Sequence, residues 1–286
     1  MPESPEVEVL ARFVAERTRG RRIRTVELDE FRALKTRNRP LAELAGRTVT
    51  GVRRHGKHLA VATDGPVLVV SFGRAGWLRW VPAADPAADP ADDQHPAADP
   101  AADDAPPAAA PLGALTLEDG ASFVLTDAGS WLSFGLSVVD DIADVPAIAK
   151  LGPDPLDDGF FLADLEAVVD GRRKQLKAVL QEQESLAGIG NAYSDEILHV
   201  ARLSPLAHAS TLDAGERARL FAAIREVLTD ALADRLPVPI DGLKAAKAAS
   251  MRVHGRTGEP CPVCGGLVED IPGSKGAAQF CPICQA

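Results

Sequence analysis

Residues 261–286 read CPVCGGLVEDIPGSKGAAQFCPICQA and hold all four cysteines of the 286-residue chain. The cysteines form two C-x-x-C pairs, Cys261 with Cys264 and Cys281 with Cys284. This spacing predicts one Zn²⁺ bound by four thiolates, and such a shell leaves no position open for water, so the zinc is structural. Two disulfides or an empty cluster are the alternatives, but the cysteines of a disulfide framework are usually spread along a chain.

The composition predicts a cytoplasmic protein with an acidic insertion. No run approaches the roughly 20 apolar residues that cross a bilayer, and no basic segment followed by an apolar one opens the chain, so we expect neither a membrane span nor secretion. The formal net charge of −10 argues at first against nucleic acid as a partner. However, residues 81–112 carry seven aspartates and no Lys or Arg, and the net charge is −3 without them. This Ala/Asp/Pro segment is predicted to be disordered, so local basic clusters matter more than the total charge.

The chain start has the pattern of a helix. Apolar residues from Val7 to Val14 recur at helical spacing and predict a helix over about residues 5–18. Ser4 is expected to be its N-cap and Pro5 its first residue, where a missing N–H costs nothing.

Short β-branched runs follow and predict strands over residues 22–28, 47–54, 57–63, 67–73, 114–117, 122–126 and 131–139. Many short strands with Gly and Asp turns indicate an antiparallel sandwich or barrel. Amphipathic patterns then predict helices over residues 162–171, 172–184, 191–203 and 212–235. The predicted fold class is α+β and multidomain, with a β domain over 1–140, a helical domain over 141–250 and a metal module over 251–286; the insertion 81–112 extends one hairpin of the β domain.

Residues 186–198, LAGIGNAYSDEIL, interrupt two helices with Gly188, Gly190 and Asn191. Asn191 is a good N-cap, and the two glycines permit a close approach of the backbone to a ligand. Exposed N–H groups at this helix start would suit a phosphate. The same local pattern also fits an ordinary helix–turn–helix corner, and the segment alone leaves both interpretations open.

Pro2 is a candidate nucleophile, because a small residue after Met1 normally lets the methionine be removed. The resulting secondary amine has a reference pKa of about 8. The helix N-terminus would lower this pKa, while Glu3 and Glu6 oppose the shift. Such an amine can attack a sugar carbon and form an iminium, and Glu3 is placed to move protons for it. Met-Pro-Glu is also a common chain start without catalytic meaning.

Taken together, these features resemble one family. MPESPEVE (1–8) is similar to the family start MPELPEVE, with Ser4 in place of leucine, and RRHGKHLA (53–60) echoes its R-x-G-K-x-L motif. LGPDPL, AGIGNAYSDEIL and VHGRTGEPCPVC also match, so the resemblance covers nearly the whole chain outside 81–112. The chain is identified as a member of the formamidopyrimidine-DNA glycosylase/endonuclease VIII family of base-excision repair enzymes.

The resemblance implies an N-terminal β-sandwich with a leading helix, a helix–two-turn–helix DNA-binding domain and a C-terminal zinc finger with four cysteine ligands. It implies a bifunctional DNA glycosylase/AP lyase in which Pro2 attacks C1′ of a damaged nucleotide, Glu3 is the acid/base and Lys57 is a DNA-contacting proton donor. The damaged base must be extruded, and strand scission follows by β-elimination. The partner would be damaged double-stranded DNA, bound by a cytoplasmic, nucleoid-associated monomer. The expected DNA contacts are Asn191, which would hold the phosphate at the lesion, with Lys177, Arg256, Lys275, Arg74 and Trp131.

Three positions depart from the family pattern. The finger arginine linked to δ-elimination is replaced by Gly276, with Lys275 beside it. In SFGRAG (71–76), Ser71 replaces a histidine and Arg74 replaces the methionine that fills the void of the flipped base.

In DAGSWL (127–132) the intercalating Arg/Phe pair is absent, and Trp131 lies near the phenylalanine position. Arg74 and Trp131 are either an alternative wedge or ordinary sheet-surface residues. Neither the lesion range nor the opposite base follows from the sequence.

Two other functions compete with the enzyme. One is a non-catalytic DNA-damage binding protein of the same fold, but Pro2, Glu3 and Lys57 together argue against it, because a binder needs no N-terminal amine. The other is an N-terminal-proline isomerase of small molecules, which explains neither the finger nor the glycine-rich hinge.

Overall fold

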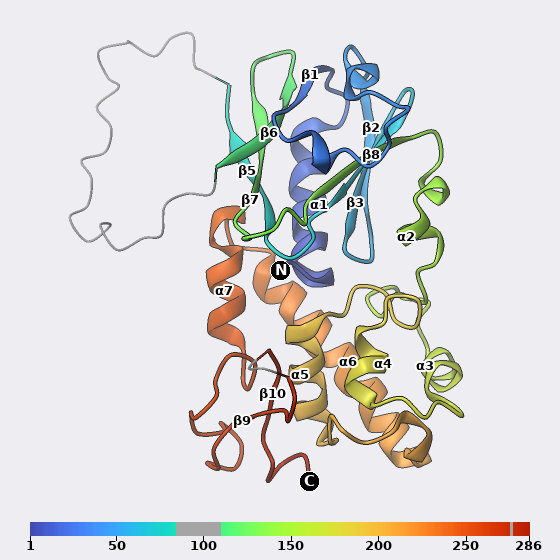
Figure 1. The fold of residues 1–286 in the computed structure, drawn as a ribbon, viewed down its shortest axis with the longest axis vertical. Coiled ribbons are helices and arrows are strands. Elements are labelled where there is room, and N and C mark those ends of the chain that lie inside the picture. The colour runs from blue at the N-terminus through green and yellow to red at the C-terminus, as the bar shows by residue number, and fades with distance from the viewer. Residues whose placement is uncertain (84–109, 275–276) are drawn as a thin grey trace, which may run out of the picture. The chain divides into compact units, whose positions relative to one another are not determined.

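The computed structural model describes residues 1–83, 110–274 and 277–286 (Figure 1). These residues divide into two compact units. One holds Met1, Val14–Val52 and Val61–Asp140, and the other holds Pro2–Phe13, Arg53–Ala60 and Asp141–Ala286. Helix α1 (Ser4–Thr18) and strands β2 (Val49–His55) and β3 (His58–Thr63) therefore contribute residues to both units. The three-domain division of the sequence stays a prediction.

Two four-stranded sheets form the predicted β-sandwich, which is confirmed (Figure 1). The first has the order β1-β6-β7-β5, with β1 at Ile23–Leu28, β5 at Gly76–Val81, β6 at Pro111–Leu117 and β7 at Ser122–Asp127. The second has the order β2-β3-β4-β8, with β4 at Val67–Ser71 and β8 at Gly135–Val139. Short 3₁₀ turns cover Phe31–Ala33 and Leu41–Leu44.

Alternating burial along the strands of the first unit shows which sheet face meets the core. In β6 and β7 the buried side chains come at every second position, as one-sided burial of a strand requires. Strand β8 is buried along its whole length. The Phe72 and Phe134 rings add an edge-to-face pair, with centroids 6.3 Å apart.

Strand β5, GWLRWV, is absent from the predicted strands, because one predicted strand ends at residue 73 and the predicted insertion begins at residue 81. Its Trp77 is buried, and Val81 pairs with Ser122 in β7. At the other edge Pro111 pairs with Thr126 and begins β6. Both ends of the predicted insertion are therefore strand, because each pairs with β7. Residues 84–109, which carry the rest of the predicted disorder, lie outside the described residues.

Helix α5 (Asn191–Ala201) is the centre of the second unit, and almost all of its side chains are buried. It lies beside α6 (Ala214–Arg235) and α4 (Leu176–Gln181) (Figure 1). The other helices of this unit are α2 (Pro146–Ala149), α3 (Leu162–Val169) and α7 (Leu243–Ser250), with 3₁₀ turns at Ile142–Asp144, Ala209–Thr211 and Ile240–Gly242. Within the described ranges, no helix has the length and apolar character needed to span a membrane.

A capping box fixes the start of α6, and the last residue of this helix is buried. The Asp213 carboxylate accepts the N–H of Glu216 at 2.7 Å, and the Glu216 carboxylate accepts the N–H of Asp213 at 3.0 Å, which is a reciprocal capping box. Twenty-two residues later the helix ends at Arg235, which is 2% exposed.

Candidate active site and metal centre

The Glu3 carboxylate is buried at the first turn of α5. It accepts the backbone N–H groups of Gly190 and, at 3.1 Å, of Ala192. It also accepts the Lys247 ammonium at 3.1 Å. Glu3 is 1% exposed and Pro2 beside it is buried. A helix N-terminus stabilises negative charge, so α5 holds this carboxylate as an anion.

Gly190 lets the start of α5 approach Glu3 and Lys57 closely. A Cβ at this position would lie 2.6 Å from the Glu3 carboxyl carbon and 2.8 Å from Lys57 Nζ, so any other residue would displace the site. Asn191 is the first residue of α5 and Gly190 its cap, so the predicted N-cap role of Asn191 is wrong. The predicted phosphate site is also wrong for these N–H groups, because Glu3 already occupies the donors of Gly190 and Ala192.

A second buried carboxylate, Glu6, lies in the first turn of α1. It accepts the Glu3 N–H at 2.9 Å, the Tyr193 hydroxyl at 2.5 Å and the Lys247 ammonium at 3.1 Å. Arg235 Nε, at the end of α6, lies 3.9 Å from Glu6 Oε1. Glu3, just before α1, and Glu6, on its first turn, are therefore paired carboxylates.

Ser4 is the first residue of α1 and not its N-cap, so that prediction is wrong. Its N–H donates to the Gly188 carbonyl at 3.0 Å, while its buried Oγ has no hydrogen-bond partner among the described residues. Gly188 has a φ of +87°, and a Cβ there would lie 2.6 Å from Ser4 Cβ, so this glycine is required where the chain start meets the hinge.

Lys57 lies in the turn between β2 and β3 and is partly buried. Burial lowers the pKa of Lys57, and the Lys247 charge lowers it further, although Glu3 opposes both. Burial alone would raise the pKa of Glu3, but the charges of Lys247 and Lys57 hold that pKa below its ordinary value. The structure thus brings the predicted Pro2, Glu3 and Lys57 into one unit, with an ionised carboxylate between two lysines.

The predicted DNA contacts Lys177 and Asn191 are engaged in hydrogen bonds. Lys177 Nζ donates to the Asn191 carbonyl at 3.1 Å and to Asp195 Oδ1 at 2.5 Å. The Asn191 side chain accepts from Gln181 Nε2 at 2.8 Å and donates to the Ala277 carbonyl. Lys177 therefore stabilises the first turn of α5 through these hydrogen bonds. Its contact with DNA stays a prediction.

Arg256 lies in the C-terminal module, where Nη1 pairs with Glu259 at 2.7 Å and Nε donates to the Met251 carbonyl at 2.5 Å. Its contact with DNA also stays a prediction. Lys275 and Gly276 lie outside the described residues.

Arg74 and Trp131 lie on two neighbouring loops of the first unit. The Arg74 N–H donates to Ser133 Oγ at 2.8 Å, and Trp131 is 84% exposed. Asp127 shapes the second loop by accepting the N–H groups of Gly129 and Ser133. Both side chains are therefore exposed on loops that contact each other. Their use as a wedge stays a prediction.

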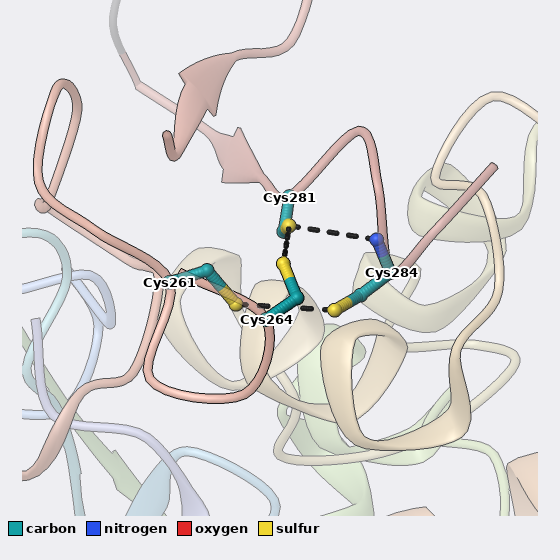
Figure 2. Close-up of side chains that lie close together, drawn as sticks. All are labelled: Cys261, Cys264, Cys281 and Cys284. Carbon is teal, nitrogen blue, oxygen red and sulfur yellow. Dashed lines mark hydrogen bonds between the residues drawn. The ribbon is translucent and has the colours of Figure 1, made fainter. Parts of the chain in front are cut away.

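The four cysteine sulfurs lie within 4.8 Å of one another (Figure 2). Figure 2 shows Cys264 facing Cys281, and their sulfurs are 3.4 Å apart. All four cysteines are free. Burial alone would raise the pKa of Cys261, but N–H groups of Cys264 and Val263 and the His199 side chain lower it to about 6. Four convergent sulfurs fit a tetrahedral metal ion, so the predicted metal ligands are brought together.

Three residues of the carboxylate site were not predicted from the sequence. Tyr193 is the only tyrosine of the chain and lies inside the AGIGNAYSDEIL motif, which was a signal for it. Arg235 ends an amphipathic helix, and Lys247 lies in the Ala/Lys-rich segment LKAAKAAS of α7. The latter two residues belong to no motif.

The sequence matches known protein domains and proteins along most of its length. Residues 1–128 match the formamidopyrimidine-DNA glycosylase N-terminal domain, and residues 151–237 match the formamidopyrimidine-DNA glycosylase H2TH domain. A formamidopyrimidine-DNA glycosylase of Mycolicibacterium gilvum is 32% identical over 300 residues, covering 100% of this chain and 98% of that protein.

Two solved structures have the same fold. The MutM (Fpg) protein of Thermus thermophilus has a TM-score of 0.77 and 30% identity, covering 99% of this chain and 98% of that one. The Lactococcus lactis Fpg in complex with DNA containing FAPY-dG has a TM-score of 0.81 and 25% identity, covering 99% of both chains.

Proposed function

Because this chain belongs to the formamidopyrimidine-DNA glycosylase family, we propose that it is a DNA glycosylase of base-excision repair with AP lyase activity. The family predicted from the sequence is thus confirmed. The observation that carries the proposed activity is the buried Glu3 carboxylate next to Pro2, which is hydrogen-bonded to the first turn of α5 and to Lys247 and lies in the field of Lys57. A protein that only binds DNA has no need of a buried anion at its chain start.

The proposed reaction begins when removal of Met1 leaves Pro2 with a secondary amine. The nitrogen lone pair attacks C1′ of the damaged nucleotide. An N–C1′ bond forms, the C1′–base bond breaks, and the base leaves with a proton. The C1′–O4′ bond then opens, O4′ takes up a proton, and C1′ becomes part of a cationic iminium. Loss of a C2′ proton expels the 3′-phosphate and nicks the strand, and water releases the amine.

The site residues divide the proton transfers between them. Since the pKa of Glu3 lies below its ordinary value, its carboxylate is ionised at neutral pH. Glu3 is therefore suited to accept the proton of the Pro2 ammonium and to stabilise the iminium. Lys57, whose pKa is lowered chiefly by burial, is a stronger acid than an ordinary lysine and is suited to protonate O4′.

The four-cysteine module is proposed to hold one Zn²⁺. Cys261, Cys264, Cys281 and Cys284 would be its ligands, and the ion would hold the module together without taking part in the reaction. The protein is further proposed to act on damaged double-stranded DNA as a cytoplasmic, nucleoid-associated monomer.

The test of this proposal is borohydride trapping. Purified protein that mass spectrometry shows to lack Met1 is expected to form a covalent adduct with a duplex containing an abasic site, because borohydride reduces the iminium to a stable amine. A panel of single-lesion duplexes then identifies the base released, and the ends of the cut strand show whether elimination stops after the β step. Binding to these duplexes without adduct, base release or nicking would instead support the non-catalytic damage-binding protein.

A further inference from the structure

Lys247 is a largely buried lysine of the site and lies in none of the family motifs named above. It lies on α7, and its side chain is 12% exposed. Its Nζ lies 3.1 Å from Glu3 Oε1 and 3.1 Å from Glu6 Oε2, so one ammonium bridges both carboxylates. The same nitrogen lies 4.4 Å from the centre of the Tyr193 ring.

These surroundings satisfy a buried ammonium on each side. Two of its donors face carboxylates, and the electron-rich face of Tyr193 provides a cation–π contact. Burial alone would lower the pKa of Lys247, but Glu3 and Glu6 raise that pKa above its ordinary value. Lys247 therefore stays charged, whereas burial makes Lys57 a weaker base.

Charged groups from several parts of the second unit surround Glu3. α1 contributes Glu6, the β2–β3 turn contributes Lys57, α7 contributes Lys247 and α4 contributes Lys177, while Arg235 of α6 lies next to Glu6. Lys247 is the only one of these for which the structure gives hydrogen bonds to both carboxylates within the described residues. It fixes Glu3 Oε1, while the N–H of Gly190 fixes Oε2.

We propose that Lys247 is a positioning residue for the glycosylase reaction, which fixes the orientation of Glu3 and keeps it ionised for proton transfer. This inference rests on the proposed function. A purely structural ion pair that ties α7 to α1 would contribute to stability, but it would leave the pH dependence of the reaction unchanged.

The test compares single-turnover rates of wild type and Lys247→Met across pH, at saturating duplex containing an abasic site. Removing a cation next to a carboxylate raises its pKa by roughly 1–3 units. Two breaks are expected on the acidic limb of the rate profile, an upper one for the Pro2 ammonium and a lower one for Glu3. Since Glu3 must be ionised to work, the lower break is expected to move to higher pH by roughly 1–3 units. Lys247→Arg keeps the charge and is expected to keep the lower break in place.

Lys150→Met is the matched control, because Lys150 is 68% exposed and pairs only loosely with Glu184 at 3.9 Å. Its profile is expected to match that of the wild type. An unshifted lower break in a folded Lys247→Met protein would overturn the role of Lys247 and leave the proposed function intact. A wild-type protein that traps no abasic DNA would overturn the proposed function itself.

Glu6→Gln keeps the inference testable if Lys247→Met does not fold. This change removes the carboxylate that competes with Glu3 for the Lys247 ammonium. The charge of Lys247 then acts on Glu3 alone. The lower break is then expected to move to lower pH, opposite to the shift expected for Lys247→Met. A lower break that stays in place or moves to higher pH would contradict the role of Lys247.

Discussion

Pro2→Gly is expected to slow borohydride trapping on abasic DNA by about 10²-fold, equivalent to about 2.7 kcal/mol in the barrier. Glycine also permits removal of Met1 and keeps an amine, but a primary one. Its backbone is far freer than that of proline, so the nitrogen is no longer held in one place next to Glu3. A protein in which an uncleaved N-terminal extension turns the Pro2 nitrogen into an amide is expected to trap nothing. The measurement is the rate of adduct formation on a gel.

Binding controls separate lost chemistry from lost recognition. A tetrahydrofuran abasic analogue lacks the C1′ hydroxyl, so it cannot open to an aldehyde or form an iminium. A duplex that contains it therefore measures binding alone, and Pro2→Gly is expected to bind it with nearly the wild-type affinity. Pro40→Gly makes the same substitution at a residue of the first unit and is expected to trap normally. Trapping at the wild-type rate by the amide-blocked protein would rule out Pro2 as the nucleophile.

Local patterns were enough to predict the metal ligands but not the whole carboxylate site. The four cysteines follow from spacing alone, because each C-x-x-C turn brings its own pair of sulfurs together. Glu3 was assigned from its place next to Pro2, but Lys57 was assigned only through the family resemblance, since it is far from Glu3 in the chain and the two meet through tertiary packing. The main strands and helices followed from periodicity, whereas β5 was missed between the strand predicted to end at residue 73 and the insertion.

The errors at the α5 N-terminus have one physical cause. Free N–H groups at a helix start predict an anion, and an anion is indeed bound there. It is the carboxylate of Glu3, 187 residues away from Gly190 in the chain, and nothing in the local sequence shows that partner. Lys247 shows the same limit, because an Ala/Lys-rich helix usually exposes its lysines, and only tertiary contacts with Glu3, Glu6 and Tyr193 cover this one.

Loss of the metal is expected to unfold the C-terminal module. Its hairpin consists of β9 (Glu269–Asp270) and β10 (Gln279–Phe280), and its buried core contains little beyond Val253, Val268 and the ligands Cys261 and Cys281. So few contacts do not hold a fold, whereas a structural zinc site contributes about 10–16 kcal/mol of apparent binding free energy at neutral pH. Cys281→Ser is expected to reduce the metal content from one ion per chain to none and to expose the module to proteolysis.

The same change is expected to weaken DNA binding, because the module is fastened to the helix that carries the site. Glu196 of α5 accepts the N–H groups of Val253 and His254, and Asn191 donates to Ala277 within the module. Without the module, Asn191 loses one of the partners that hold its side chain. The affinity for abasic duplex is expected to fall at least about tenfold, or about 1.4 kcal/mol.

Ile283→Ser is the control for the metal prediction, because Ile283 lies between Cys281 and Cys284 in the same turn and is 65% exposed. Like Cys281→Ser it introduces a serine into this turn, but it leaves all four cysteine sulfurs in place. Metal content, measured by release to a chromophoric chelator, and protease resistance are expected to match those of the wild type. If Cys281→Ser retained a full equivalent of zinc and a protected module, the four-thiolate site would be disproved, because the remaining three sulfurs would not account for a closed tetrahedral shell.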